Sequence, residues 1–153
     1  MISEQMDTTE QFKAVQVVTQ RIDIVQRWID DLATNPPQTH GCLHDSKGHC
    51  CIGRLYEVLH GPDAWTSLSS GLYQTQEFAT GGLSIRDAAR VGVYSLVLVT
   101  RPSCRTHPIT WEKFFTLHND ARYSFAFIRR LIITYLLIPL ERELQSLLGH
   151  ESR

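Results

Sequence analysis

The stretch 124-SFAFIRRLIITYLLIPLERELQSLL-148 carries apolar side chains on almost every face as far as Ile138. Ser124 is a favoured N-cap residue, so the spacing predicts a helix over 125–138. We expect Pro139 to kink or restart that helix, after which leucines continue at helical spacing. A helix this apolar lies at the centre of a core or is buried by a partner. The sequence therefore predicts a mainly α (α+β) fold, with four to five helices around the C-terminal helix and a small β-hairpin.

A second long helix is predicted at the N-terminal end. Apolar residues recur every three or four positions over 9–33, with polar residues on the other faces. Thr8 and Gln11 have the spacing of a capping box, and Asn35-Pro36-Pro37 ends the pattern. After this helix the sequence predicts a hairpin from strands 41–44 and 48–51, a helix over 51–60 and a loop over 61–83. Ser84 then begins a predicted helix over 85–91, and a strand over 93–100 is preferred to a buried helix. A loop over 101–110 and a helix over 109–117, broken by 118–120, complete the predictions.

Composition narrows the class of protein. The chain has 153 residues, of which 42% are hydrophobic, and this suits a single domain over 1–153 with a flexible start at 1–8. The net charge of −1 gives no general attraction to nucleic acid or to an anionic membrane. The acidic start lacks a secretory signal, and the apolar run 131–140 is about half of the ~20 residues that a membrane span needs. A cytoplasmic protein with reduced thiols is expected.

Several motifs occur in an order that resembles a group of small phage and bacterial proteins with no established activity. The motifs are W28-x3-L32, GCL at 41–43, HCCIGRLYEV at 49–58, LSIRDAARVGV at 83–93 and LHNDARYSFAFIRRLI at 117–132. The pattern of the group runs W-x3-L, G-x-L, CCLGVLC, LP-x2-V-x2-W-x-GL and LND-x-G-x-SF-x2-IA-x2-I. The chain departs from it at Tyr56, where the group has cysteine, at Arg129, where it has alanine, and at Arg122 or Tyr123, where it has glycine.

The resemblance implies a phage or mobile-element accessory protein and no mechanism. Its most specific part is the pair CCIG and ND-x3-SF-x2-I. We therefore predict a structural signature made of Cys50, Cys51, Gly53, Asn119, Asp120, Ser124 and Phe125.

Residues 40–53 are rich in metal-ligand types, and a metal site is a weak alternative. The candidate ligands are His40, Cys42, His44 and His49. A hairpin could bring them together, but zinc hairpins usually carry a spaced pair such as C-x2-C on each side. No metal and no cofactor is predicted.

A reactive thiol is a second alternative. Cys51 would lie at the start of a helix, where free N–H groups and the helix dipole lower a thiol pKa. His107 and Asn119 follow in the order Cys, His, Asn that papain-like enzymes use. Buried cysteine at a tight strand-to-helix corner explains the same residues without catalysis. Whether the chain is an enzyme stays open, with the non-enzymatic interpretation preferred.

A helix-turn-helix is a third alternative. Ala88-x3-Gly92-Val93 has the required spacing, and a recognition helix would begin near Ser95. The apolar block at 96–99 stands where base-reading side chains belong, so nucleic-acid binding is not favoured.

The preferred function is protein–protein binding, either to a host protein or to a second copy of the chain. No complete catalytic set is present, and the C-terminal helix can exceed what one small core covers. The residues expected to make this contact are Leu131, Tyr135, Leu136, Leu140 and Leu144.

Overall fold

The fold is known from a computed structural model that describes residues 7–40, 44–45, 48–61, 83–100 and 106–151, with only the backbone for 44–45, 96–100, 106–107 and 150–151. The described part is mainly helical, as predicted. Its helices are α1 (Thr8–Ala33), α2 (Cys51–His60), α5 (Ile85–Val91), α6 (Trp111–Asp120) and a long C-terminal helix formed by α7 (Phe125–Ile132), the π-helical turn η1 (Ile133–Leu137) and α8 (Ile138–Glu151).

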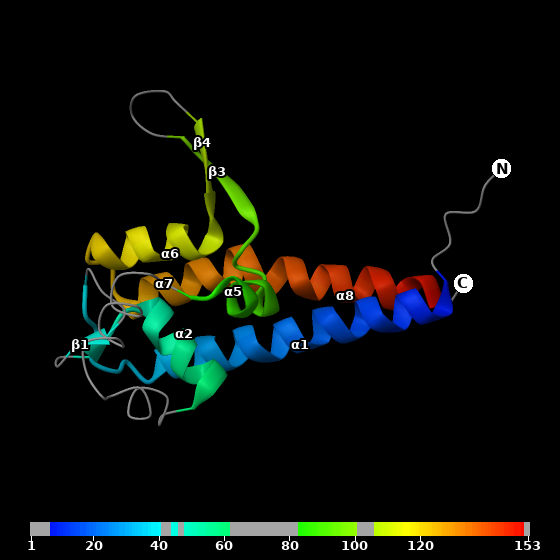
Figure 1. Ribbon diagram of the computed structural model, residues 1–153, viewed down its shortest axis with the longest axis horizontal. Helices are drawn as coiled ribbons and strands as arrows, with labels where there is room; N and C mark the ends of the chain where they lie inside the picture. The colour runs from blue at the N-terminus through cyan, green and yellow to red at the C-terminus, as the bar shows by residue number, and fades with distance from the viewer. Residues whose placement is uncertain (1–6, 41–43, 46–47, 62–82, 101–105, 152–153) are drawn as a thin grey trace.

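The two long helices form the frame of the molecule. The C-terminal helix lies antiparallel beside α1, and α6 covers the opposite side of α7 (Figure 1). Side-chain amide and guanidinium groups connect the pair at both ends: Gln11 Nε2 donates to the Leu147 carbonyl at 2.7 Å and Arg129 Nε to the Ile29 carbonyl at 3.2 Å. The core between the elements is apolar, and its largest fully buried side chains include Trp28, Ile29, Leu32, Ile52, Leu55, Phe115, Phe125, Ile128 and Ile132.

The start of α1 differs from the prediction by one position. Asp7 is the N-cap, and its carboxylate accepts from the Thr9 N–H at 3.0 Å. Thr8 is already helical, so the capping box with Gln11 does not form. A carboxylate at the N-cap also interacts favourably with the positive end of the helix dipole, which explains why Asp7 takes this role.

The structure accommodates Pro139 through a π-helical turn. Proline in a helix removes one N–H and its ring collides with the carbonyl four residues back, here that of Tyr135. The turn η1 widens the helix immediately before it, and the Ile138 N–H donates to Ile133, five residues back. The helix therefore continues past Pro139 instead of restarting.

The described residues form two antiparallel strand pairs. The predicted one pairs β1 (His44–Asp45) with β2 (Gly48–His49). The predicted strand over 93–100 is β3 (Leu96–Thr100), and it pairs with β4 (Thr106–Thr110). The loop predicted over 101–110 is therefore wrong for residues 106–110. The sequence does not predict β4 because Pro108 argues against a strand. A strand tolerates proline where the missing N–H is not needed for pairing, as in a two-stranded ribbon.

The structure also differs from the prediction at the junction between α6 and α7. The predicted helix over 109–117 begins at Trp111, where the Thr110 hydroxyl accepts from the Lys113 N–H at 3.1 Å, and it continues through Asp120. The break comes at Arg122, whose φ of 69° is left-handed. The Tyr123 N–H returns to the His118 carbonyl at 3.2 Å, which is the closing bond of a Schellman motif. Ser124 then caps α7 as predicted, accepting from Phe127 at 3.2 Å.

The helices α2 and α5 match their predicted ranges, and Ser84 caps α5 by accepting from the Asp87 N–H at 3.1 Å. Residues 1–6 and 62–82, which hold most of the predicted flexible start and long loop, lie outside the described residues. Among the described helices, none combines the length and the apolar character that crossing a membrane requires.

Candidate functional site

The adjacent cysteines form a tight corner at the start of α2. Cys50 is the N-cap, and its sulfur accepts from the Gly53 N–H at 3.3 Å. Cys51 is fully buried, and its thiol donates to the Phe115 carbonyl on α6 at 3.5 Å. Trp28 on α1 donates its indole N–H to the Cys51 carbonyl at 2.8 Å. The corner therefore joins α2 to both α1 and α6.

Asn119 is the polar centre of this corner. Its side chain is fully buried near the end of α6. Its Oδ1 accepts from the Cys51 N–H at 3.1 Å and from Gln38 Nε2 at 2.9 Å, and its Nδ2 donates to the Thr39 carbonyl at 2.8 Å. One amide thus connects the segment after α1, the start of α2 and the end of α6. The predicted signature residues Cys51 and Asn119 are in direct contact.

The same segment after α1 packs against the β-hairpin. Residue 38 bridges residue 49 of β2, and the Thr39 N–H donates to the His49 carbonyl at 2.9 Å. Gly48 is required here, since a Cβ at this position would collide with the carbonyl oxygen of Pro37. The hairpin and Asn119 together fix the path of residues 37–39.

The chemistry of the corner is unfavourable for a nucleophile. Burial raises the pKa of the Cys51 thiol well above its ordinary value, and the nearby Cys50 and Asp120 act in the same direction, against the helix N–H groups. A thiolate is the reactive form of cysteine, so this environment disfavours reaction. The Asn119 amide is already bonded to two backbone groups and to the Gln38 side chain.

His107 follows Cys51 in the chain order of a papain-like trio with Asn119, but its backbone lies apart from the other two residues. Its backbone lies in β4, in a hairpin that extends away from the helices (Figure 1). That hairpin joins the Trp111 end of α6, whereas Asn119 lies at the other end, about 12 Å along the helix axis. The imidazole of His107 lies outside the described side chains.

The metal-ligand candidates are only partly described. Cys42 and the side chain of His44 lie outside the described residues, and His40 is half-buried. His49 places Nε2 at 3.3 Å from Glu57 Oε2. In the part of the chain that is described, no three His, Cys, Asp or Glu side chains group in a way that could hold a metal ion.

The structure excludes the second helix of the helix-turn-helix alternative and agrees with the predicted strand. Gly92 does end α5 in the left-handed conformation, with a φ of 92°. The residues after it form β3 and not a recognition helix. β-branched side chains at 97 and 99 favour a strand, which explains the outcome.

An aromatic surface runs across α6, the turn after it, α7 and η1. We name it the aromatic face and define it as Trp111, Phe114, His118, Tyr123, Phe127 and Tyr135. Neighbouring ring centroids along it are 4.5–5.7 Å apart. The exposed fraction is 45% for Tyr123, 37% for Phe127 and 44% for Tyr135. Such offset and edge-on ring contacts hold the rings in a fixed array while leaving part of each in solvent.

The predicted interaction residues divide between the core and this surface. Leu136 is buried, and Leu131, Leu140 and Leu144 are half-buried, mostly against the molecule's own core. Only Tyr135 is exposed and belongs to the aromatic face. The other five residues of the aromatic face were not predicted from the sequence. The signal was present in the spacing of Phe114 with His118 and of Tyr123 with Phe127, which are pairs four residues apart.

Comparison with models of known protein families, with curated proteins and with solved structures finds no match for this chain.

Proposed function

We propose that the chain acts without catalysis by binding another protein through the aromatic face. The observation that carries the proposal is the exposure of Tyr123, Phe127 and Tyr135 within a continuous ring array. Aromatic residues are enriched at the centres of protein interfaces, because a rigid ring buries a large area and loses little conformational entropy. The resemblance of the CCIG and ND-x3-SF motifs supports placing this activity in a phage or mobile-element accessory protein.

The position of the face suits a contact surface. Its rings on α7 and η1 contact rings of α6, and α6 lies on the side of α7 opposite α1 (Figure 1). Trp111 and Phe114 are half-buried and pack against the core, which gives the exposed rings a rigid support. Prearranged side chains lose less freedom on binding than mobile ones. A second copy of the chain is the first partner to test, and a host protein is the other.

The test compares two double variants that each remove two exposed aromatic rings. Tyr123→Ser/Tyr135→Ser changes the aromatic face, and Phe12→Ser/Tyr94→Ser changes rings that are 64% and 53% exposed elsewhere. Sedimentation velocity measures self-association, and affinity capture from host lysate measures binding to other proteins. We expect the wild type to form a complex in one of the two measurements. The first variant should lose that complex and the second should keep it.

Two results would contradict the proposal. One is a wild-type chain that stays monomeric and captures nothing above the background of a denatured control. The other is equal loss of binding by both variants, since that would mean non-specific adhesion of exposed rings. Circular dichroism of each variant establishes that the helices are retained.

A further inference from the structure

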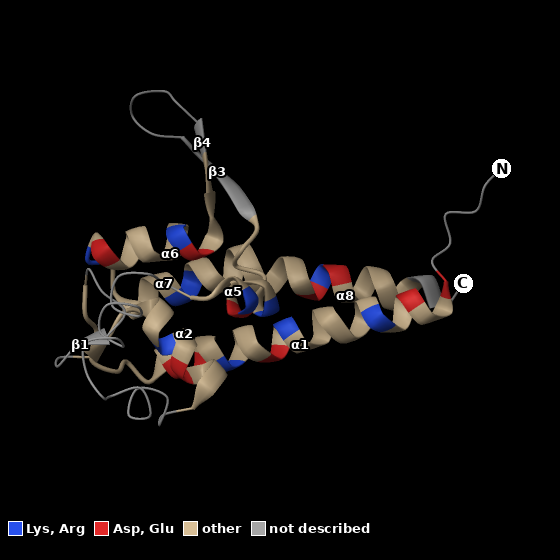
Figure 2. Cartoon of the chain, viewed as in Figure 1, with Lys and Arg blue, Asp and Glu red and all other residues tan. Residues whose placement is uncertain are grey.

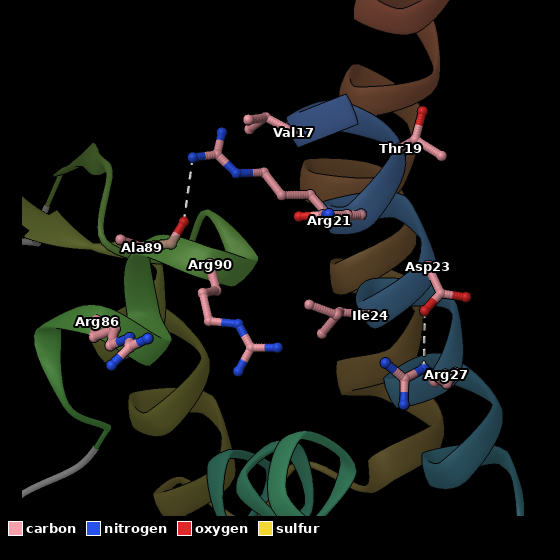
Figure 3. A pocket seen from close by; sticks show the side chains of 10 residues that line it. Val17, Thr19, Arg21, Asp23, Ile24, Arg27, Arg86, Ala89 and Arg90 are labelled. Atoms are coloured by element: carbon pink, nitrogen blue, oxygen red, sulfur yellow. Dashed lines mark hydrogen bonds and ion pairs between the residues drawn. The ribbon is translucent and has the colours of Figure 1, made fainter. Parts of the chain in front are cut away.

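A groove of about 760 Å³ lies between α1 and α5, away from the aromatic face. Figure 3 shows Arg21 and Ile24 of α1 and Arg90 of α5 extending into the space between the two helices. It is lined by Val17, Thr19, Gln20, Arg21, Asp23, Ile24, Arg27, Arg86, Ala89 and Arg90. Its volume falls in the range of about 300–1,000 Å³ that is typical of small-molecule sites.

The lining of the groove is strongly basic although the chain as a whole carries a net charge of −1. Four arginines face one carboxylate, that of Asp23. Asp23 is already occupied by Arg27, with 3.1 Å between Oδ2 and Nε. The groove lining therefore holds an excess of positive charge. Figure 2 shows basic residues, with acidic residues beside them, on α5 and on the adjacent part of α1.

The guanidinium groups at the groove retain unused hydrogen-bond donors. Arg21 crosses from α1 to donate Nη2 to the Ala89 carbonyl at 3.2 Å, and its Nε is buried with no hydrogen-bond partner among the described residues. Arg90 is 3.8 Å from Asp87, whose other oxygen lies 2.6 Å from His60. Within the described part of the chain, Arg86 forms no ion pair, and it is exposed to solvent. The Arg86 and Arg90 guanidinium groups are exposed and keep N–H donors that the acceptor oxygens of a ligand can reach.

We propose that this groove is a binding site for a small organic phosphate. Guanidinium groups donate paired, planar hydrogen bonds that match phosphate oxygens, and several around one cavity can share a multiply charged group. The side chains of Val17, Ile24 and Ala89 add an apolar wall that suits the organic part of such a ligand. The site is independent of the aromatic face, so either proposal can fail alone.

A concave site for a small ligand fits these residues better than a nucleic-acid surface does. Binding to duplex DNA uses basic residues spread along the backbone, and the overall charge gives little support for that. Here four arginines line one groove, and one of them, Arg27, is paired with Asp23. Duplex DNA is therefore a competing outcome in the test.

The experiment is isothermal titration of the full chain with ATP, pyrophosphate, adenosine and a short DNA duplex. The test variant is Arg86→Gln/Arg90→Gln, which changes two exposed side chains of α5. The matched control is Arg130→Gln/Arg142→Gln, which makes the same charge change at exposed positions of α7 and α8. Each lost charged contact is expected to weaken binding by about tenfold.

We expect ATP and pyrophosphate to bind, adenosine not to bind, and the α5 variant to bind ATP at least about tenfold more weakly than the control does. Tighter binding of ATP than of pyrophosphate would assign a contribution to the apolar wall. The proposal is overturned if neither phosphate compound binds at millimolar concentration or if adenosine binds as tightly as ATP. Equal weakening in both variants, or tighter binding of the duplex than of ATP, would also overturn it.

Discussion

At the scale of single residues, the corner of the molecule depends on groups whose hydrogen bonds are all internal. Asn119 bonds to residues 38–39 and to Cys51, both far from it in the sequence, and Cys51 supplies both an N–H and a carbonyl to the same network. The sequence predicted these residues as a structural signature from motif resemblance. It could not predict that they touch, because contacts between positions 51 and 119 depend on the tertiary path of α6.

Replacing Asn119 tests the network. Asn119→Ala leaves the Cys51 N–H and the Thr39 carbonyl buried without that partner, so we expect the free energy of unfolding to fall by about 2–4 kcal/mol. Chemical denaturation measures the change. Gln145→Ala removes an exposed amide from α8 and should change stability by less than about 0.5 kcal/mol. A similar small loss in both variants would mean that the corner is not held by Asn119.

The Cys51 thiol predicts a dependence of stability on pH. Its pKa is raised in the folded chain, so the folded state keeps the proton after the unfolded chain has lost it at its ordinary value of 9.0. Full stability is therefore present below pH 9. Above it, this one thiol lowers the free energy of unfolding by up to about 1.4 kcal/mol per pH unit. Denaturation from pH 7 to 10 should show a steeper fall for the wild type than for Cys51→Ala. Equal slopes would contradict the buried, neutral thiol.

At the scale of elements, most helices could be predicted because their apolar spacing and their caps agree. Ser84 and Ser124 fixed the starts of α5 and α7, and Gly61 fixed the end of α2. The elements that the sequence did not predict correctly have local causes. β4 contains a proline and pairs only with its hairpin partner, and the end of α6 is set by a left-handed arginine that no sequence rule favours.

One ion pair adds to the apolar packing of α2 on α1. Arg54 meets Asp31 with two contacts of 2.7 and 2.6 Å, and this bond raises the pKa of Arg54 above its usual range. Both side chains are partly exposed, so we expect Asp31→Ala to cost only about 1–2 kcal/mol of unfolding free energy. Asp30→Ala removes the same charge from the exposed neighbouring position and should cost less than about 0.5 kcal/mol. Thermal denaturation of the two variants measures these losses. Equal losses of stability in Asp31→Ala and Asp30→Ala would contradict a role for the ion pair.

The α6–α7 turn provides a prediction of increased stability. Arg122 adopts a φ of 69°, which costs a residue with a Cβ about 1–2 kcal/mol. Arg122→Gly should raise the free energy of unfolding by about 0.5–1 kcal/mol after the added chain entropy of glycine is included. Arg130→Gly, inside α7, should instead lower it by about 1 kcal/mol. Urea titration measures both, and a destabilised Arg122→Gly would contradict the turn geometry.

At the scale of the whole molecule, two long antiparallel helices present different surfaces on their opposite sides. The α1 side carries the arginine groove, and the α6–α7 side carries the aromatic face. The mainly helical fold and the role of the C-terminal helix were predictable from its apolar composition. The position of the aromatic face was not predictable, because a helix that is apolar all round gives no sign of which side its neighbours leave uncovered. Leu136 and Tyr135 are adjacent, yet one is buried and the other exposed.

The most direct test of the aromatic face is photo-crosslinking in host lysate from a benzophenone amino acid placed at one position at a time. Phe127 lies on the face and is 37% exposed, whereas Phe12 is 64% exposed on α1, so general adhesion would favour position 12. The proposed function predicts a discrete crosslinked species from position 127, formed with another protein or a second copy, and none from position 12. Equal crosslinking from both positions, or none from position 127, would contradict it.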